Sequence, residues 1–187
     1  GATFLVDTNF LFALQLEGHR FAMSLEALGR ALNSIGAKLV YLNETGQEYW
    51  RVWTGKRAEI LKLLKVYPNE VVADADDSFI STAVARGCSD TESFETFFSS
   101  IHTPPSQMPE GSSIKILEDE KIVREVQKAN NDNQLKNDIQ KWCLKLRPFW
   151  NKQPKSNSAL RHDAALIYVA EFERGSGNKI FILTLDR

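Results

Sequence analysis

The apolar positions near the N-terminus alternate between short continuous runs and runs with helical spacing. Residues 4–7 and 38–42 are mostly continuous apolar runs, which predict two buried strands. Between them, helical spacing predicts helices over residues 10–16 and 19–35, and Gly36 is placed to end the second of these. The chain is therefore expected to begin as strand, helix, helix, strand.

The next segment repeats the two-helix pattern. Residues 43–46 predict a turn, from which a helix is expected to begin near Gln47. A separate helix is predicted over residues 56–66, and Pro68 marks its end.

The middle of the chain has a different character. Residues 74–95 are rich in acids, and residues 103–113 form a loop of proline, serine and glycine. Residues 115–147 are polar and helix-forming, with an asparagine-rich patch, and Pro148 follows them. We predict that residues 70–155 form a largely helical insertion, or lid, on a core fold.

The core pattern returns near the C-terminus. A strongly helical stretch over residues 158–173 is followed by a glycine-containing turn and an apolar strand over residues 180–185. Strands that alternate with helices in this way predict an α/β fold, with a mostly parallel central sheet and helices on both of its faces.

Composition narrows the class of protein. The 187 residues suit a single domain over 1–187, and their net charge of -1 gives no overall attraction to nucleic acid or anionic lipid. No apolar run has the length of a membrane span. Two cysteines without metal-ligand spacing favour free thiols and a cytoplasmic location. A first residue that is not methionine, and a last residue directly after Asp186, indicate a C-terminally truncated fragment of a longer chain.

Acidic side chains follow the first and last predicted strands. Asp7 and Asp186 each come at the end of an apolar run, and ligands of open α/β sheets bind just beyond such strand ends. Mg²⁺ and Mn²⁺ take oxygen ligands, and several acids from different elements would have to converge to hold one. The candidates are Asp7, Glu48, Asp163 and Asp186, with Glu44 as a rival to Glu48.

Each acid also has a simpler structural explanation. Asp7 suits a helix N-cap, Asp163 suits the positive end of a helix dipole, and Asp186 suits a turn. The recurrence of acids in matching elements is what favours a shared site.

Four short motifs, in order along the chain, resemble those of PIN domains, a family of metal-dependent nucleases. Residues 5–11 resemble the opening motif, an Asp-Thr-Asn sequence after a strand. Residues 42–48 are similar to the second motif, in which a glutamate follows a strand and a short turn. Residues 161–167 resemble the third, an aspartate with small and apolar neighbours, and residues 183–186 resemble the fourth, a Thr-x-Asp sequence.

The resemblance implies a PIN-like three-layer α/β/α fold that hydrolyses phosphodiester bonds, usually of single-stranded RNA, with DNA as an alternative substrate. It implies Mg²⁺ or Mn²⁺ held by four catalytic acids, Asp7, Glu48, Asp163 and Asp186. Asn9 and Thr184 are expected to support these ligands. Thr8 either does the same or caps the following helix, and capping is favoured.

Basic residues supply the expected surface for an anionic substrate. Arg161 and His162, beside Asp163, are placed to meet a phosphate, and His162 is not expected to bind metal because the cluster is otherwise all-oxygen. A basic strip over residues 136–161 includes Arg147 and Lys152 and is interleaved with aromatic residues, which either stack on bases or belong to the core. Further domains of a longer chain are expected as partners, a homodimer remains open, and no membrane is expected.

The chain also departs from the family pattern. The interval between the second and third motifs is long, which suits larger PIN-like proteins with an inserted helical region, and Glu44 stands where a small residue is common. The strand and loop that normally follow the fourth acid are missing. A dehalogenase-type phosphatase is disfavoured because Asn9 occupies the position of its second aspartate. A non-enzymatic PIN-like scaffold for RNA or protein remains the alternative function.

Overall fold

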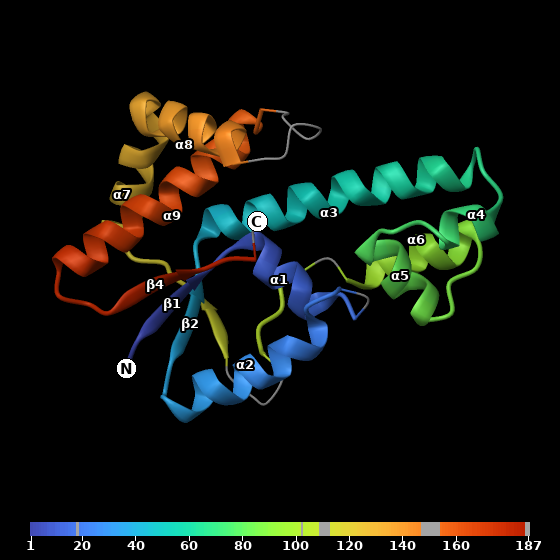
Figure 1. Ribbon diagram of the computed structural model, residues 1–187, viewed down its shortest axis with the longest axis horizontal. Helices are drawn as coiled ribbons and strands as arrows, with labels where there is room; N and C mark the ends of the chain where they lie inside the picture. Colours follow the sequence, from blue (N-terminus) through green and yellow to red (C-terminus); the bar gives the residue numbers. More distant parts are fainter. Residues whose placement is uncertain (18, 102, 109–112, 147–153, 186–187) are drawn as a thin grey trace.

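The computed structural model describes residues 1–17, 19–101, 103–108, 113–146 and 154–185 (Figure 1). Its strands β1 (Thr3–Val6), β2 (Lys38–Tyr41), β3 (Ile114–Ile116) and β4 (Ile180–Leu183) form one sheet in the order β3-β2-β1-β4. Every pairing between them is parallel, and Thr3 lies opposite both Lys38 and Ile180. The predicted α/β class and parallel sheet are confirmed.

Helices connect the strands, as a parallel sheet requires. Those before the third strand are α1 (Thr8–Gln15), α2 (Ala22–Ser34), α3 (Asn43–Leu64), α4 (Asn69–Ala73), α5 (Ser78–Ala85) and α6 (Thr91–Ser100). Those after it are α7 (Glu120–Asn131), α8 (Asn133–Leu146) and α9 (Asn157–Gly175).

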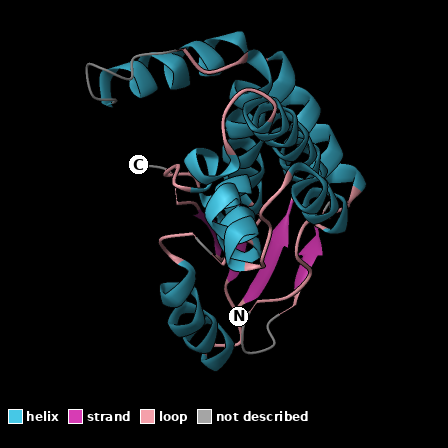
Figure 2. Cartoon of the chain, turned by 90° about the vertical axis from the view of Figure 1, so that its right-hand side faces the viewer, coloured by secondary structure: helices cyan, strands magenta, loops and turns pink. Residues whose placement is uncertain are grey.

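The sheet is covered on both faces because side chains of a strand alternate between them. Val6 belongs to a hydrophobic cluster with residues of α1, α2, α3, α5 and α6. Its neighbour Leu5 belongs to a second cluster with residues of α7, α8 and α9. In Figures 1 and 2, α7–α9 accordingly lie on one side of the strands, and α1 and α2 on the other.

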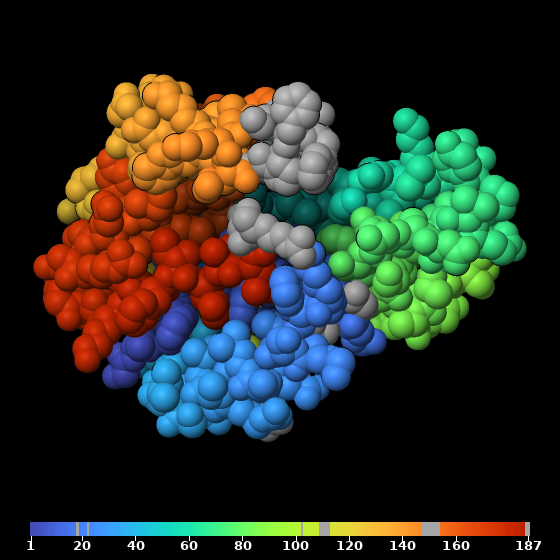
Figure 3. Space-filling view, viewed as in Figure 1, coloured from blue at the N-terminus to red at the C-terminus, as the bar shows by residue number. Residues whose placement is uncertain are grey.

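Helix α3 extends well beyond the sheet and forms the base of a second lobe with α4–α6 (Figure 1). Its Trp53 and Ile60 are fully buried in the same cluster that includes Val6. The space-filling view shows this lobe on the right (Figure 3). The lobe therefore shares the core of the sheet and has no separate one.

Two predictions about secondary structure are wrong. Residues 43–46, predicted as a turn, form the first turn of α3, and this helix continues without a break to Leu64 instead of dividing into two. Residues 115 and 116, predicted as the start of a polar helical region, belong to strand β3 beside β2.

The described part of residues 70–155 is an integral part of the fold. It supplies β3 to the sheet, and α7 packs directly against α9 within the second cluster. Whether this segment is an insertion relative to a smaller family core stays a prediction.

Candidate functional site

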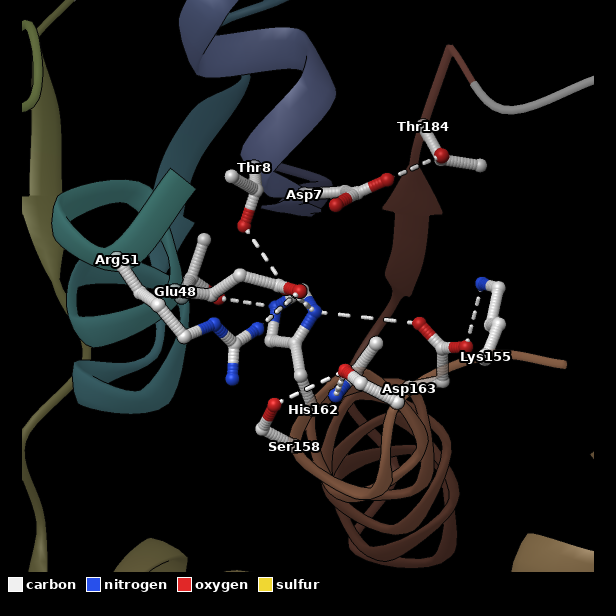
Figure 4. A network of polar contacts seen from close by, with 12 residues as sticks. Asp7, Thr8, Glu48, Arg51, Lys155, Ser158, His162, Asp163 and Thr184 are labelled. Carbon is white, nitrogen blue, oxygen red and sulfur yellow. Dashed lines mark hydrogen bonds and ion pairs between the residues drawn. The ribbon is translucent and has the colours of Figure 1, made fainter. Parts of the chain in front are cut away.

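The carboxyl ends of the two central strands bring Asp7 and Thr184 together. Asp7 follows β1 and Thr184 follows β4, and the backbone N–H of Asp7 donates to the carbonyl oxygen of Leu183 at 3.1 Å. The Thr184 hydroxyl donates a short hydrogen bond to Oδ2 of Asp7 (Figure 4). Asp7 occupies the N-cap position of α1, yet its side chain makes no capping hydrogen bond. Its carboxylate instead contacts Thr184 at the edge of the sheet, and Asp7 as a residue is only 6% exposed.

Thr8 links this edge to helix α3. Its hydroxyl donates to Oε2 of Glu48 at 3.2 Å, and the residue is buried in the first turn of α1. The favoured capping role of Thr8 is therefore wrong, because its hydroxyl reaches across to another helix. Glu48 also accepts a hydrogen bond at 2.9 Å from the guanidinium of Arg51, one turn further along α3.

His162, on α9, connects this helix to Glu48 and Thr45 of α3. Its Nδ1 forms a short ion pair with Oε2 of Glu48, and its Nε2 lies 2.9 Å from the hydroxyl of the fully buried Thr45. His162 itself is 3% exposed. Both ring nitrogens thus have protein partners, so this histidine holds Glu48 in position (Figure 4).

The charges of this pair reinforce each other. Burial tends to raise the pKa of Glu48, but the hydrogen bond and charge of His162, with the charge of Arg51, hold the pKa below its ordinary value. Burial tends to lower the pKa of His162, whereas the hydrogen bond and charge of Glu48, and then the charges of Asp7 and Asp163, raise it. Each residue of the pair therefore favours the charged form of the other.

Asp163 has a cation of its own. The ammonium of Lys155, in the segment just before α9, donates to Oδ2 of Asp163 at 2.7 Å, and the two side chains are 16% and 21% exposed. Oδ1 of Asp163 lies 3.9 Å from Nδ1 of His162. Asp163 is thereby connected to Glu48 through the histidine (Figure 4).

These contacts bring together three acids that are far apart in the sequence, Asp7, Glu48 and Asp163. Their carboxylate oxygens are of the type that hard divalent cations prefer. In the described part of the chain, however, no group of three or more acidic, histidine or cysteine side chains surrounds a single metal position. Glu48 and Asp163 are each bonded to protein cations, and Asp186 lies outside the described residues.

Of the other predicted site residues, two lie on described helices and three lie outside the described residues. Asn9 is exposed in the first turn of α1, and Arg161 is exposed on α9. Asp186, Arg147 and Lys152 lie outside the described residues, so their predicted roles as fourth acid and substrate contacts stay predictions.

One assignment changes. His162, predicted to contact substrate, is buried and bonded on both nitrogens, so it is a positioning residue for Glu48. Glu44 and Glu48, the two candidates for the second acid, differ in their contacts. Glu48 belongs to the network of acids, whereas Glu44, one turn earlier, makes no ion pair within the described residues.

Lys155 and Thr45 are the contributors that the sequence alone did not single out. Lys155 was one of several lysines in the basic strip, and only its contact with Asp163 distinguishes it. Thr45 lay in a predicted turn and has no sequence signal that connects it to a histidine 117 positions away.

The structure also shows the surroundings of the basic residues near the site. Trp142 in the strip is 62% exposed, so it does not belong to the core. The basic residues that follow Glu48 on α3 are paired with acids: Arg51 with Glu48, Lys56 with Asp77 and Arg57 with Glu95.

A cavity of about 340 Å³ adjoins Glu48, and it is lined by residues of α3, α7 and α9 that include Glu44, Glu48 and His162. Cys88 and Cys143 are both free, in line with the prediction. Within the described ranges, no helix combines the length and apolar character needed to cross a bilayer.

Comparisons of the chain with protein-family models, curated proteins and solved structures found no match.

Proposed function

We propose that this protein is a metal-dependent nuclease that hydrolyses phosphodiester bonds, with single-stranded RNA as its main substrate and a PIN-like α/β/α fold. The observation that carries the proposal is the meeting of Asp7, Glu48 and Asp163 at one edge of a parallel sheet. Ligand sites of such sheets lie at this edge. The acids come from the end of β1, from α3 and from α9, which are the elements that the motif resemblance assigns to them.

The donor chemistry of these residues fits Mg²⁺ or Mn²⁺, since the three acids offer only oxygen. Asp7 and Asp163 would be the main ligands, and Glu48 and Asp186 would complete the set. When bound, the metal supplies a water of lowered pKa and a polarised phosphate. Because Lys155 is bonded to Asp163, metal and ammonium would compete for that carboxylate.

The remaining residues orient the acids. Thr184 fixes Oδ2 of Asp7, and Thr8, Arg51 and His162 fix the carboxylate of Glu48. Such partners determine where a ligand's oxygens point and how basic they are.

Cleavage of a fluorescently labelled single-stranded RNA in Mn²⁺ tests the proposal. We expect cleavage by the wild-type protein, its loss in EDTA, and a loss of about 10²-fold or more in Asp7→Asn and Asp163→Asn, because each change removes a charged ligand. Asp76→Asn is the matched control, since Asp76 is exposed between α4 and α5 in the other lobe. Circular dichroism must show that all variants are folded.

A non-enzymatic scaffold is the second candidate, and one observation favours it. Glu48 and Asp163 already have protein cations as partners, and the described residues contain no three-ligand group. Titration calorimetry with Mn²⁺ separates the two functions. The nuclease requires a site that binds Mn²⁺ and is weakened in Asp7→Asn, whereas absence of both Mn²⁺ binding and cleavage would leave the scaffold.

A further inference from the structure

A second cavity lies next to the cavity that is lined by Glu48. The first has a volume of about 340 Å³ and includes Glu48 and His162 in its lining, and the second has a volume of about 570 Å³. Asn130 and Arg161 line both cavities, so the two lie next to each other. Together they are here called the asparagine groove, which extends from Glu48 to the turn between α7 and α8.

The far part of this groove is lined almost entirely by amides and cations. Its lining consists of Asn130, Asn131, Asn133, Lys136, Asn137, Asn157, Leu160 and Arg161. No acid is among them, although the chain as a whole has a net charge of -1. This composition favours an anionic ligand that also offers hydrogen-bonding groups.

Most of these asparagine side chains form no hydrogen bond with other described residues. Asn131 donates to the carbonyl oxygen of Gln127, but within the described residues the side chains of Asn133, Asn137 and Asn157 form no hydrogen bond. All three are exposed, so a ligand can reach their donors and acceptors. An asparagine amide presents both a donor and an acceptor, which suits the edges of bases.

The two cations of the groove, Lys136 and Arg161, differ in burial. Lys136 is buried and its ammonium donates to the carbonyl oxygen of Asn130 at 2.8 Å, which neutralises the end of α7. Arg161 is exposed and makes no ion pair with an acid in the described ranges. It lies next to His162, at the point where the two cavities join, and so can contact a phosphate close to the acids.

We propose that the asparagine groove binds the segment of single-stranded nucleic acid next to the scissile phosphate, with Arg161 on the backbone and the asparagine amides on base edges. The nature of the ligand rests on the proposed nuclease function. A volume of about 570 Å³ lies within the range of small-ligand sites, about 300–1,000 Å³. We therefore expect it to take one or two nucleotides of a single strand, because the base edges of a duplex are already paired.

The test measures binding in EDTA, so that cleavage plays no part. Anisotropy of a labelled single-stranded RNA is recorded over a series of salt concentrations for the wild type, Arg161→Ala and the double variant Asn133→Ala/Asn137→Ala. Lys65→Ala, at the far end of α3, and Asn33→Ala, on α2, are the matched controls because both residues are exposed and distant from the groove.

We expect Arg161→Ala to weaken binding about tenfold, as for loss of one charged contact. It should also reduce the slope of log K against log salt by about 0.7, as for one phosphate contact on a single strand. The asparagine double variant should change the ranking of homopolymeric RNAs while leaving that slope unaltered. The controls should behave as the wild type does.

Three results would overturn the groove assignment: equal affinity of Arg161→Ala and Lys65→Ala, competition by duplex RNA as effective as by single strands, or no binding of any single-stranded nucleic acid. Cleavage is then assayed separately in Mn²⁺. Binding that depends on Arg161 without cleavage supports the groove and contradicts the nuclease. Cleavage with unchanged binding in both groove variants supports the nuclease and contradicts the groove.

Discussion

His162 is the residue on which the geometry of the candidate site most depends. It is buried, it contacts Glu48 with one ring nitrogen and Thr45 with the other, and it lies beside Asp163 in sequence and in space. Removing one partner of a buried ion pair leaves an uncompensated charge, which costs about 3–5 kcal/mol. Without this histidine, Glu48 would lose its principal cation.

The His162–Glu48 pair predicts a pH dependence of stability. The pKa of His162 is raised above 6.5 in the folded state, so its stabilisation is fully present below pH 6.5 and is lost as pH rises through the folded-state value. The pKa of Glu48 is lowered below 4.5, so its stabilisation is present above pH 4.5 and is lost as pH falls through the folded-state value. The pair therefore contributes fully between pH 4.5 and 6.5.

Urea unfolding in EDTA at several pH values measures this effect. We expect the free energy of unfolding of the wild type to decline above pH 6.5, and His162→Gln to lack that part of the decline. The same pH profile in both proteins would contradict a raised pKa of His162.

Lys155 gives a second prediction at this scale. Lys155→Met should lower the free energy of unfolding by about 1–3 kcal/mol, because it removes the cation bonded to the largely buried Asp163. It should also increase the rise in melting temperature on adding Mn²⁺, since metal no longer competes with ammonium. Lys141→Met is the control, because Lys141 pairs with Asp138 at the surface, where such pairs contribute about 0–1 kcal/mol. Equal responses of the two variants to Mn²⁺ would contradict the competition.

The residues of the site were only partly predictable from the sequence. Asp7 and Asp163 were found because each has a place in a strand or helix pattern that can be recognised locally. The charge and orientation of the acids also depend on Lys155, on His162 and, through His162, on Thr45. These residues act through contacts between different elements. Such contacts leave no local pattern, which is why His162 was assigned to substrate.

At the scale of elements, helix α3 shows how tertiary contacts override local preference. Thr45-Gly46 and Thr54-Gly55 suggest breaks, yet the helix is continuous from Asn43 to Leu64. Thr45 is buried against His162, and Gly46 lies close enough to the ring of Tyr41 that a Cβ would be 3.4 Å from it. The start of α3 is thus fixed by its neighbours. Strand β3 was missed for a similar reason, since its three residues form a strand by pairing with β2.

Gly55 provides a direct test of the continuity of α3. It lies in the exposed middle of the helix, and a Cβ at this position would meet nothing within 4 Å. Gly55→Ala should therefore raise the free energy of unfolding by about 0.5–1 kcal/mol, through the higher helix propensity of alanine. Gly36→Ala should have the opposite effect, because Gly36 has φ +61° after α2. Thermal unfolding measures both, and a destabilising Gly55→Ala would contradict an unbroken helix.

At the scale of the whole molecule, the α4–α6 lobe and the sheet share one hydrophobic cluster. Trp53 lies at its centre, where its indole N–H donates to the carbonyl oxygen of Phe98 at 3.1 Å and its ring packs against Phe79, Phe97 and Phe98. The same cluster includes Val6 of strand β1 and Phe10 of helix α1. The acids at the end of β1 and in α3 consequently depend on packing that extends into the lobe.

This continuity predicts that the lobe and the sheet unfold together. Trp53→Ala should cost about 3–5 kcal/mol, as for other large buried side chains, and should lower the hydrogen-exchange protection of Leu5 in β1 as much as that of Phe98 in α6. Trp142→Ala is the matched control, since Trp142 is 62% exposed on α8 and its loss should change neither. If Trp53→Ala left the protection of β1 unchanged while that of α6 fell, the lobe would be an independent unit. Glu48 would then be held by its contacts with Thr8 and His162, and not by the packing of α3 against the lobe.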